Sequence, residues 1–478
     1  MKKKKTLFAV FIFSLAQRPF ALFANQNAES LLEGYLQNDL NVKKLASSLE
    51  NQILEDKASK ISNGWNFTLE TGTVTIYTGE DSNRITFSPS AELSVPSARN
   101  LTVGVSSDIE TQTKEDTSTK NTSVYMKFDL YSKNKQKLEL IALKSEREVL
   151  EAQRALQNAL ISAEKSFYTE LKSLYSTAAS IVSTQNNLYD DQLSFNEIIA
   201  KGYSSTSLKY RQAQMKVLSD ERQVQIDQRE LERQTKIFAT KCGTDYTGTN
   251  ALDFLPATVP SAEAVDVLSF SKDSYTKIES ATWTSYINTL TRKAQSKITV
   301  TGKAGYTFDN SSTDSDTLDL GTAFTWNNTG LTASAGVSFP IGTDSYYPVY
   351  TFSLSFSPQP FRLAEIEDKQ DEIAAQQEQI DILAAEKDYQ TDVIDRQTQL
   401  EDILWKKETN KQSLEMYTSL AKDEERYYKQ GYVSKSEYNN ALTNKENYEI
   451  QCLINDIELL IYNGETKLLF CRDEELGS

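Results

Sequence analysis

The sequence has no histidine, although it is 478 residues long. Histidine supplies the base of Ser-His-Asp triads and is the commonest metal ligand, so these classes of site are excluded. There are only three cysteines, and none has the CxxC spacing of a metal or redox motif. A glycosidase with paired carboxylates is the remaining enzyme class, but no carboxylate pair lies on a recognisable catalytic framework. The sequence therefore predicts a protein that is not an enzyme and has no cofactor.

Long apolar runs are confined to the first 24 residues. This segment has four lysines (Lys2 to Lys5), an apolar run from Leu7 to Ala16 and small residues from Ala21 to Ala24, which predicts a secretory signal at 1–24. Elsewhere no run of 18 apolar residues occurs, so a membrane-spanning helix is excluded. If the chain enters a bilayer, it must do so as a closed barrel.

Positive charge is also scarce. The formal net charge is −16, and removing the signal, with its five positive and no negative residues, makes it about −21. Phosphate binding needs a basic surface, so nucleic acid is not expected as a partner.

One pattern occurs twice, 229 residues apart. In each copy a helical run reaches Gly-Tyr, then a serine-rich segment, then a second helical run of thirty or more residues. This pattern predicts a helical hairpin in which glycine is the left-handed residue that ends the first helix and serine caps the next. The residues of the two tips are Gly202, Tyr203 and Ser205 in the first copy and Gly431, Tyr432 and Ser434 in the second.

The spacing of the copies indicates two related halves of one fold. Residues 25–243 form the first half and 264–478 the second, joined by a linker at 244–263. In the first half we expect a helix at 28–61, strands within 65–131, an exposed loop from Thr111 to Thr122, and a hairpin at 134–241. In the second half we expect a helix at 264–296, strands within 297–357 and a hairpin at 361–470. Each half has four strand candidates, at 65–77, 85–95, 99–110 and 122–131 and at 297–308, 317–327, 330–339 and 348–357.

The strands of the second half alternate apolar and small polar residues, which is typical of outer-membrane barrels. Aromatic residues near the strand ends predict the girdles of such a barrel, at Trp326, Phe339, Tyr347 and Tyr350. A soluble β-sandwich with its polar face outward is the alternative, because alternation occurs there too.

Cys242 and Cys471 end the two repeats. A disulfide between them would form if the fold brings these ends together, and buried free thiols are the alternative.

The order of helix, strands and helical hairpin, repeated once behind a signal, resembles the TolC-like outer-membrane efflux proteins over nearly the whole mature chain. The turn Tyr428-Tyr-Lys-Gln-Gly431-Tyr-Val-Ser-Lys-Ser-Glu437 is similar to the hairpin tips of that family, and Phe128-Asp-Leu-Tyr-Ser and Phe356-Ser-Pro-Gln-Pro-Phe361-Arg are similar to its strand ends. The resemblance implies an α+β membrane protein, a homotrimer in the outer membrane with a shared twelve-stranded β-barrel, continued by a tunnel of long antiparallel α-helices in the periplasm. It also implies a gate at the tips, opened by a periplasmic adaptor protein and an inner-membrane pump.

Two features depart from that family. Its members have two strands in each half, whereas four candidates are present here, so the number of strands per chain is either four or eight. The acidic ring of the family corresponds to Glu437 and Asn440, which is one carboxylate instead of two; with Tyr428, these are the candidate gate-lining residues.

The function expected is therefore the exit duct of a tripartite efflux or type I secretion system, which passes small molecules or proteins to the exterior. The alternative is a secreted coiled-coil adhesion protein with β-rich heads. For Gly202 and Gly431, adaptor docking is the functional interpretation, and a plain helix end is the structural one.

Overall fold

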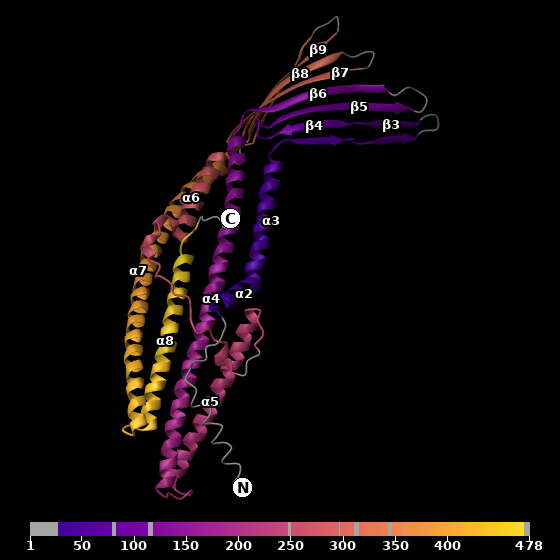
Figure 1. The fold of residues 1–478 in the computed structure, drawn as a ribbon. Helices are drawn as coiled ribbons and strands as arrows, with labels where there is room; N and C mark the ends of the chain where they lie inside the picture. Colours follow the sequence, from indigo (N-terminus) through magenta and orange to yellow (C-terminus); the bar gives the residue numbers. More distant parts are fainter. Residues whose placement is uncertain are drawn as a thin grey trace. The chain divides into compact units, whose positions relative to one another are not determined.

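The structure is a computed structural model in which two compact units can be distinguished (Figure 1). The sheet unit consists of Ser48–Gln153 and Lys277–Glu386, and the hairpin unit of Met1–Ser47, Arg154–Thr276 and Lys387–Ser478. Each unit therefore takes segments from both halves of the sequence. The structure describes residues 27–78, 83–112, 118–246, 250–295, 297–309, 315–342, 347–357 and 359–472. The predicted signal at 1–24 lies outside the described residues.

The sheet unit contains one antiparallel sheet in the order β1-β4-β5-β6-β7-β8-β9-β10, with β2 paired to β3 and β3 to β5. β1 and β2 lie in line and share one position in the sheet, and β4 and β3, which both pair with β5, share the next. These two positions are here called the first two ribbons. The sheet is therefore eight strand positions wide. Its central pair, β6 and β7, joins the two halves of the sequence. The strands are β1 (Asn66–Glu70), β2 (Thr75–Thr78), β3 (Asn83–Phe87), β4 (Ser90–Val95), β5 (Leu101–Gln112), β6 (Ser118–Tyr131), β7 (Ile298–Asp309), β8 (Asp316–Trp326), β9 (Leu331–Ile341) and β10 (Val349–Phe356).

The first two ribbons are interrupted at the same level, where the sequence predicted unbroken strands at 65–77 and 85–95. Gly72 has a positive φ of 66°, and a Cβ atom added to it would lie 2.1 Å from the carbonyl oxygen of Ser88. Only glycine fits such a position. Pro89, opposite this break, has no N–H to donate to a ladder. β1 and β2 are therefore separate strands, as are β3 and β4.

The described helices begin and end largely where the composition changes. The elements of the hairpins are α4 (Asn134–Ala200), α5 (Leu208–Lys241), α7 (Gln359–Gln430) and α8 (Lys435–Leu468), and the remaining helices are α2 (Ala28–Asn38), α3 (Leu40–Ser62) and α6 (Thr276–Ala294). Short 3₁₀ turns lie at Ala251–Phe254, Val267–Ser269, Lys272–Ser274 and Asn327–Thr329. No helix among the described residues is both long and apolar enough to cross a membrane.

Three of the expected boundaries were wrong. The helix predicted at 28–61 is divided at Asp39, whose carboxylate accepts the N–H groups of Asn41 and Val42 and so caps a new helix. The helix predicted at 264–296 begins only at Thr276, because Asp266 and Ser271 cap short 3₁₀ turns before it. The loop predicted from Thr111 to Thr122 is shorter, since β5 continues to Gln112 and β6 begins at Ser118; threonine favours strands. Residues 113–117 are outside the described part.

The hydrophobic core lies in the hairpin unit. Phe167 of α4 is fully buried and contacts the rings of Tyr35 from α2 and Phe238 from α5, at centroid distances of 5.6 and 5.2 Å. Ile450, Ile454 and Ile457 of α8 belong to the same cluster. Burial of these apolar surfaces holds α2, α4, α5 and α8 together.

Candidate functional site

The register of the sheet gathers apolar side chains on one face, here called the apolar face. Residues paired across antiparallel strands share a face, and the pairs form continuous rows. One row crosses all eight positions and contains Tyr350, Val337, Leu320, Ala304, Met126, Val103, Leu93 and Phe67. A second contains Phe339, Leu318, Tyr306, Val124, Val105, Ala91 and Leu69.

The opposite face, here called the polar face, carries hydroxyl groups, charges and glycines. One row contains Thr351, Gly336, Gly321, Lys303, Lys127, Thr102, Ser94 and Asn66. Another contains Pro340, Thr317, Thr307, Ser123, Ser106, Ser90 and Glu70. The hydroxyls of Ser123 and Thr307 share a hydrogen bond of 2.9 Å. The alternation found in the second half of the sequence thus extends across the first half.

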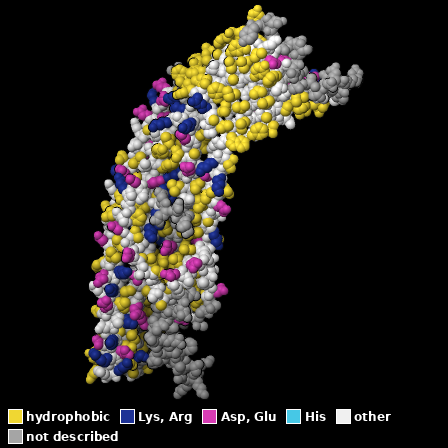
Figure 2. Space-filling view, turned by 45° about the horizontal axis from the view of Figure 1, so that its top comes forward, with side chains coloured by type: hydrophobic (Ala, Val, Ile, Leu, Met, Phe, Trp, Pro, Cys, Tyr) yellow, Lys and Arg dark blue, Asp and Glu magenta, His cyan; other side chains and the backbone are white. Residues whose placement is uncertain are grey.

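The apolar face is not covered. None of the described strand residues with an apolar side chain is buried, and Phe352 and Leu69 are 79% and 72% exposed. Figure 2 shows hydrophobic side chains gathered over the strands. A β-sandwich would bury one face of each sheet against a second sheet, but all of the described strands form a single sheet. An exposed apolar surface of this extent marks an interaction with lipid or protein.

Aromatic residues lie at both ends of the apolar face. Trp326 ends β8, while Phe339 of β9 pairs with Leu318 near the start of β8. The eight steps along the strand from residue 318 to residue 326 span about 27 Å. This length is comparable to the apolar band of an outer-membrane barrel. Tyr347 precedes β10, Tyr350 lies near its start, and both are exposed.

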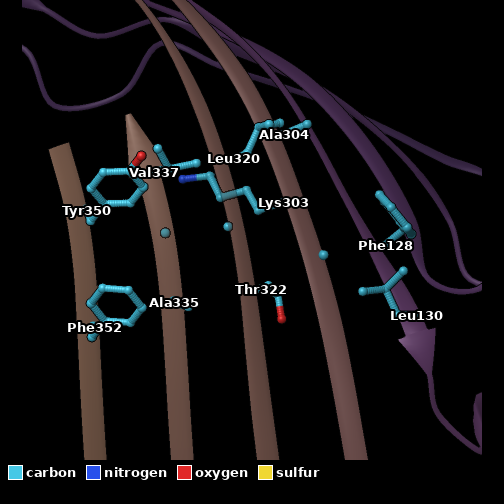
Figure 3. Close-up of a pocket in the computed structure, with 13 residues that line it drawn as sticks. Phe128, Leu130, Lys303, Ala304, Leu320, Thr322, Ala335, Val337, Tyr350 and Phe352 are labelled. Atoms are coloured by element: carbon cyan, nitrogen blue, oxygen red, sulfur yellow. The ribbon is translucent and has the colours of Figure 1, made fainter. Parts of the chain in front are cut away.

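A shallow hollow lies on the apolar face between two columns of large side chains (Figure 3). Tyr350 and Phe352 of β10 form one column, and Phe128 and Leu130 of β6 the other. Small residues such as Ala304, Thr322 and Ala335 form the floor. Lys303 is the one charged residue among those that line it, and the register places Lys303 on the polar face, so the hollow is an apolar surface.

Both hairpin tips have the predicted glycine conformation. Gly202 and Gly431 have φ values of 79° and 77°. At the first tip, the N–H groups of Gly202 and Tyr203 donate to the carbonyls of Ile199 and Ile198; at the second, those of Gly431 and Tyr432 donate to Tyr428 and Tyr427. This is the Schellman arrangement that ends a helix, so the left-handed glycine at each tip is confirmed.

The serines differ between the tips. Ser434 caps α8 in a capping box: its Oγ accepts the backbone N–H of Glu437, and the carboxylate of Glu437 accepts the backbone N–H of Ser434. In the first hairpin the cap is Ser207, whose Oγ accepts the N–H of Tyr210, and Ser205 lies in the exposed turn. The prediction from the repeat that Ser205 is the equivalent of Ser434 was therefore wrong, because α5 begins two residues later than α8 does relative to its glycine.

Glu437 and Asn440 both have partners in the chain. Hydrogen bonds from the backbone N–H and the hydroxyl of Ser434 lower the pKa of Glu437. Asn440 accepts a hydrogen bond of 2.5 Å from Asn186 of α4. Tyr428 is 40% exposed, and its ring stacks on Tyr438 with the centroids 5.6 Å apart. A gate-lining role for these residues stays a prediction.

The tip tyrosines are accessible. Tyr432 is 78% exposed, and Tyr203 is half-exposed with Lys209 over its ring at 5.3 Å. An added Cβ atom at Gly202 or Gly431 would meet no atom within 4 Å. The tips therefore offer open surface for a partner.

Polar contacts that the sequence did not indicate join α4 and α8. Asp190 accepts a hydrogen bond of 2.5 Å from Ser436, and Asn447 donates to Ser183 at 3.0 Å. Together with Asn186 and Asn440, these residues join the two hairpins near their tips. The paired residues are 246 to 264 positions apart in the sequence, and no local pattern indicates such pairs.

Cys242, Cys452 and Cys471 form no disulfide, so the pairing of Cys242 with Cys471 considered from the sequence is not present. Cys242 is buried, and burial raises its pKa to about 12, so it is an inert core residue. No group of three or more potential metal ligands occurs in the described residues.

We expect that Gly431→Val weakens the end of α7, because a left-handed residue other than glycine costs about 1–2 kcal/mol. The expected result is cleavage by a protease between α7 and α8 roughly tenfold faster than in the unchanged protein, since opening governs cleavage. Gly431→Asn is the matched control, because asparagine tolerates this conformation. The overall fold should survive in both variants. Unchanged export by cells that make the valine variant would contradict a docking role for the tip.

Residues 31–259 match the family described as TP096X N-terminal domain, and residues 260–473 match the TP096X C-terminal domain. The chain is composed of these two TP096X domains. The TP096X domains meet within the linker predicted at 244–263. No curated protein matches the chain.

Among solved structures, the TP096X chain is similar to outer-membrane channels. With the MtrE channel of Neisseria gonorrhoeae it shares 12% identity at a TM-score of 0.48, covering 92% of this chain and 88% of that chain. With the CmeC channel of Campylobacter jejuni it shares 13% identity at a TM-score of 0.46, covering 95% of this chain and 88% of that chain. With the outer membrane protein VceC of Vibrio cholerae it shares 12% identity at a TM-score of 0.44, covering 92% of this chain and 94% of that chain.

Proposed function

We propose that this protein is a subunit of an outer-membrane exit duct that passes small molecules or proteins from the periplasm to the exterior. The observation that carries the proposal is the two-faced sheet, apolar on one face and polar on the other, with both edge strands unpaired in the chain. Lipid is the natural partner of the apolar face, and water of the polar face.

The unpaired edges favour a barrel shared by several copies. In a bilayer every strand edge must be paired, because no water is present to satisfy its N–H and C=O groups. β1 and β10 stand at the two ends of the sheet order, and neither pairs with the other among the described residues. We therefore propose that copies of the chain close the barrel together, as a homotrimer.

The four helices that adjoin the sheet support a tunnel on one side of the membrane. The helices α3, α4, α6 and α7 all join the sheet at the same end of its strands (Figure 1). This follows because each half of the chain contributes four strand positions, so the chain leaves the sheet at the end where it entered. That side would be the periplasm. The exposed tips would contact a periplasmic adaptor, and through it an inner-membrane pump.

The alternative, a secreted adhesion protein with β-rich heads, would leave the apolar face in water, which is costly over so many side chains. Cell fractionation distinguishes the two. We expect the protein in the outer-membrane fraction, resistant to washing with alkaline carbonate and released by detergent. Release by carbonate or recovery from the medium would overturn the proposal.

A further inference from the structure

We infer that the edge made by β10 and α7 of one copy joins the edge made by β1 and α3 of the next copy, so that each copy contributes eight strand positions to the barrel. The inference rests on the proposed function and names the surfaces that its copies share. A trimer would then have twenty-four strands, in contrast to the twelve that the resemblance implies.

The two strand edges fit one another in direction and in face. Strand direction alternates across the eight positions of the antiparallel sheet, so β1 at the first position and β10 at the eighth run in opposite directions. They can therefore form a further antiparallel pair between two copies. On β1, Phe67 and Leu69 lie on the apolar face; on β10, Tyr350, Phe352 and Leu354 do. An antiparallel pairing therefore keeps lipid-facing and lumen-facing residues aligned across the join.

The helix beside each edge also has an unpartnered apolar stripe. On α3, Gln52 and Asp56 face α4, where they bond Glu148 and Ser145 at 2.9 and 2.8 Å. Leu54 is two residues from each of them, roughly opposite at 100° per residue. Leu54 and Ile61 are seven residues apart, and both are exposed.

On α7 the arrangement is the same. Glu378 faces α6, where Arg292 and Asn288 donate to it. Ile366, Ile373 and Ile380, spaced by seven residues, lie away from that contact and are exposed. Apolar residues at sevens are typical of a helix that packs against another helix.

The apolar stripes of α3 and α7 lie at similar distances from the sheet, and the two helices carry different balances of charge. Leu54 is eight residues from the sheet-side end of α3, and Ile366 is seven from that of α7, which places each about 11–12 Å below the strands. From Glu365 to Glu386, α7 has eight carboxylates and one lysine, whereas α3 has four lysines and three carboxylates. A second copy of this chain is therefore the partner that these surfaces fit.

Cysteine cross-linking in the full-length protein tests the join. In a Cys242→Ala, Cys452→Ser, Cys471→Ser background, Thr68→Cys is combined in turn with Thr351→Cys, Ser353→Cys or Ser355→Cys, all on the polar face; these three positions sample the possible registers. Leu54→Cys with Ile366→Cys tests the helices. Ser123→Cys with Thr307→Cys, on adjacent interior strands, is the control and should link within one chain.

We expect two- and three-chain products on non-reducing gels from one register of the strand pair and from the helix pair, and none from single-cysteine variants. A link between β1 and β10 within one chain would overturn the inference, because the sheet would close on itself. So would the absence of any inter-chain product while the control pair forms. If the protein conducts ions in a bilayer but gives no inter-chain products, the inferred join is wrong and the proposed function stands. If the protein conducts no ions, the proposed function is wrong.

Discussion

Leu93→Arg should strongly reduce the amount of assembled protein in the outer membrane. Leu93 lies on the apolar face, paired with Phe67 and Val103. An arginine on the lipid face of a barrel costs about 2–4 kcal/mol near the bilayer midplane. That cost corresponds to a roughly 30- to 700-fold loss in the folding equilibrium. Folding of the purified variant into lipid vesicles, titrated with urea, measures the loss.

Ser94→Arg is the matched control for this substitution. Ser94 is the next residue on β4, but it lies on the polar face, paired with Asn66 and Thr102. An arginine here would extend into the aqueous lumen, so folding should change little. If the two variants lost stability equally, the assignment of the faces to lipid and water would be wrong.

Arg292→Met should destabilise the helices of the sheet unit by about 3–5 kcal/mol, the usual cost of removing one partner from a buried ion pair. Arg292 of α6 donates to both carboxylate oxygens of Glu378 on α7, at 3.1 and 3.0 Å. Ser285 and Asn288 donate to the same carboxylate, which is only 8% exposed. Without the guanidinium, a buried charge would keep only two neutral donors. Thermal unfolding followed by circular dichroism measures the change.

The double variant Arg292→Met, Glu378→Met is the control, because an apolar pair of similar volume restores most of the stability lost when a buried ion pair is broken. A double variant as unstable as the single one would show that the loss came from packing.

The same pair predicts a dependence on pH. Arg292 and its neighbours lower the pKa of Glu378 in the folded protein, so its stabilising contribution is present above the ordinary glutamate pKa and is lost as the pH falls through the lowered value. In Arg292→Met the deficit should therefore be full at neutral pH and shrink in acid.

The strands were the part of the fold best predicted from sequence. The second half shows why: β7 to β10 alternate apolar and polar residues at most positions, and each begins and ends within three residues of its expected range. The tip glycines were predicted equally well, because a helix that ends in a residue with left-handed backbone conformation favours glycine at that residue. These features depend on a few neighbouring residues.

The features that escaped depend on competing local bonds or on distant partners. Asp39 and Asp266 divide predicted helices because their side chains bond nearby N–H groups, an alternative that apolar periodicity does not reveal. The contact of Asp190 with Ser436 spans 246 residues. The rows of the apolar face also depend on which residues of neighbouring strands are paired. Alternation along a strand assigns its residues to two faces, but it does not specify this pairing between strands.

The most direct test of the central claim is conductance. The protein would be extracted from outer membranes with detergent, its particle mass determined, and the particle reconstituted into a planar bilayer. The account predicts three chains of about 50 kDa each, given 53.9 kDa before signal removal, and discrete ion currents even at low open probability. A water-soluble monomer or dimer that passes no current would contradict it.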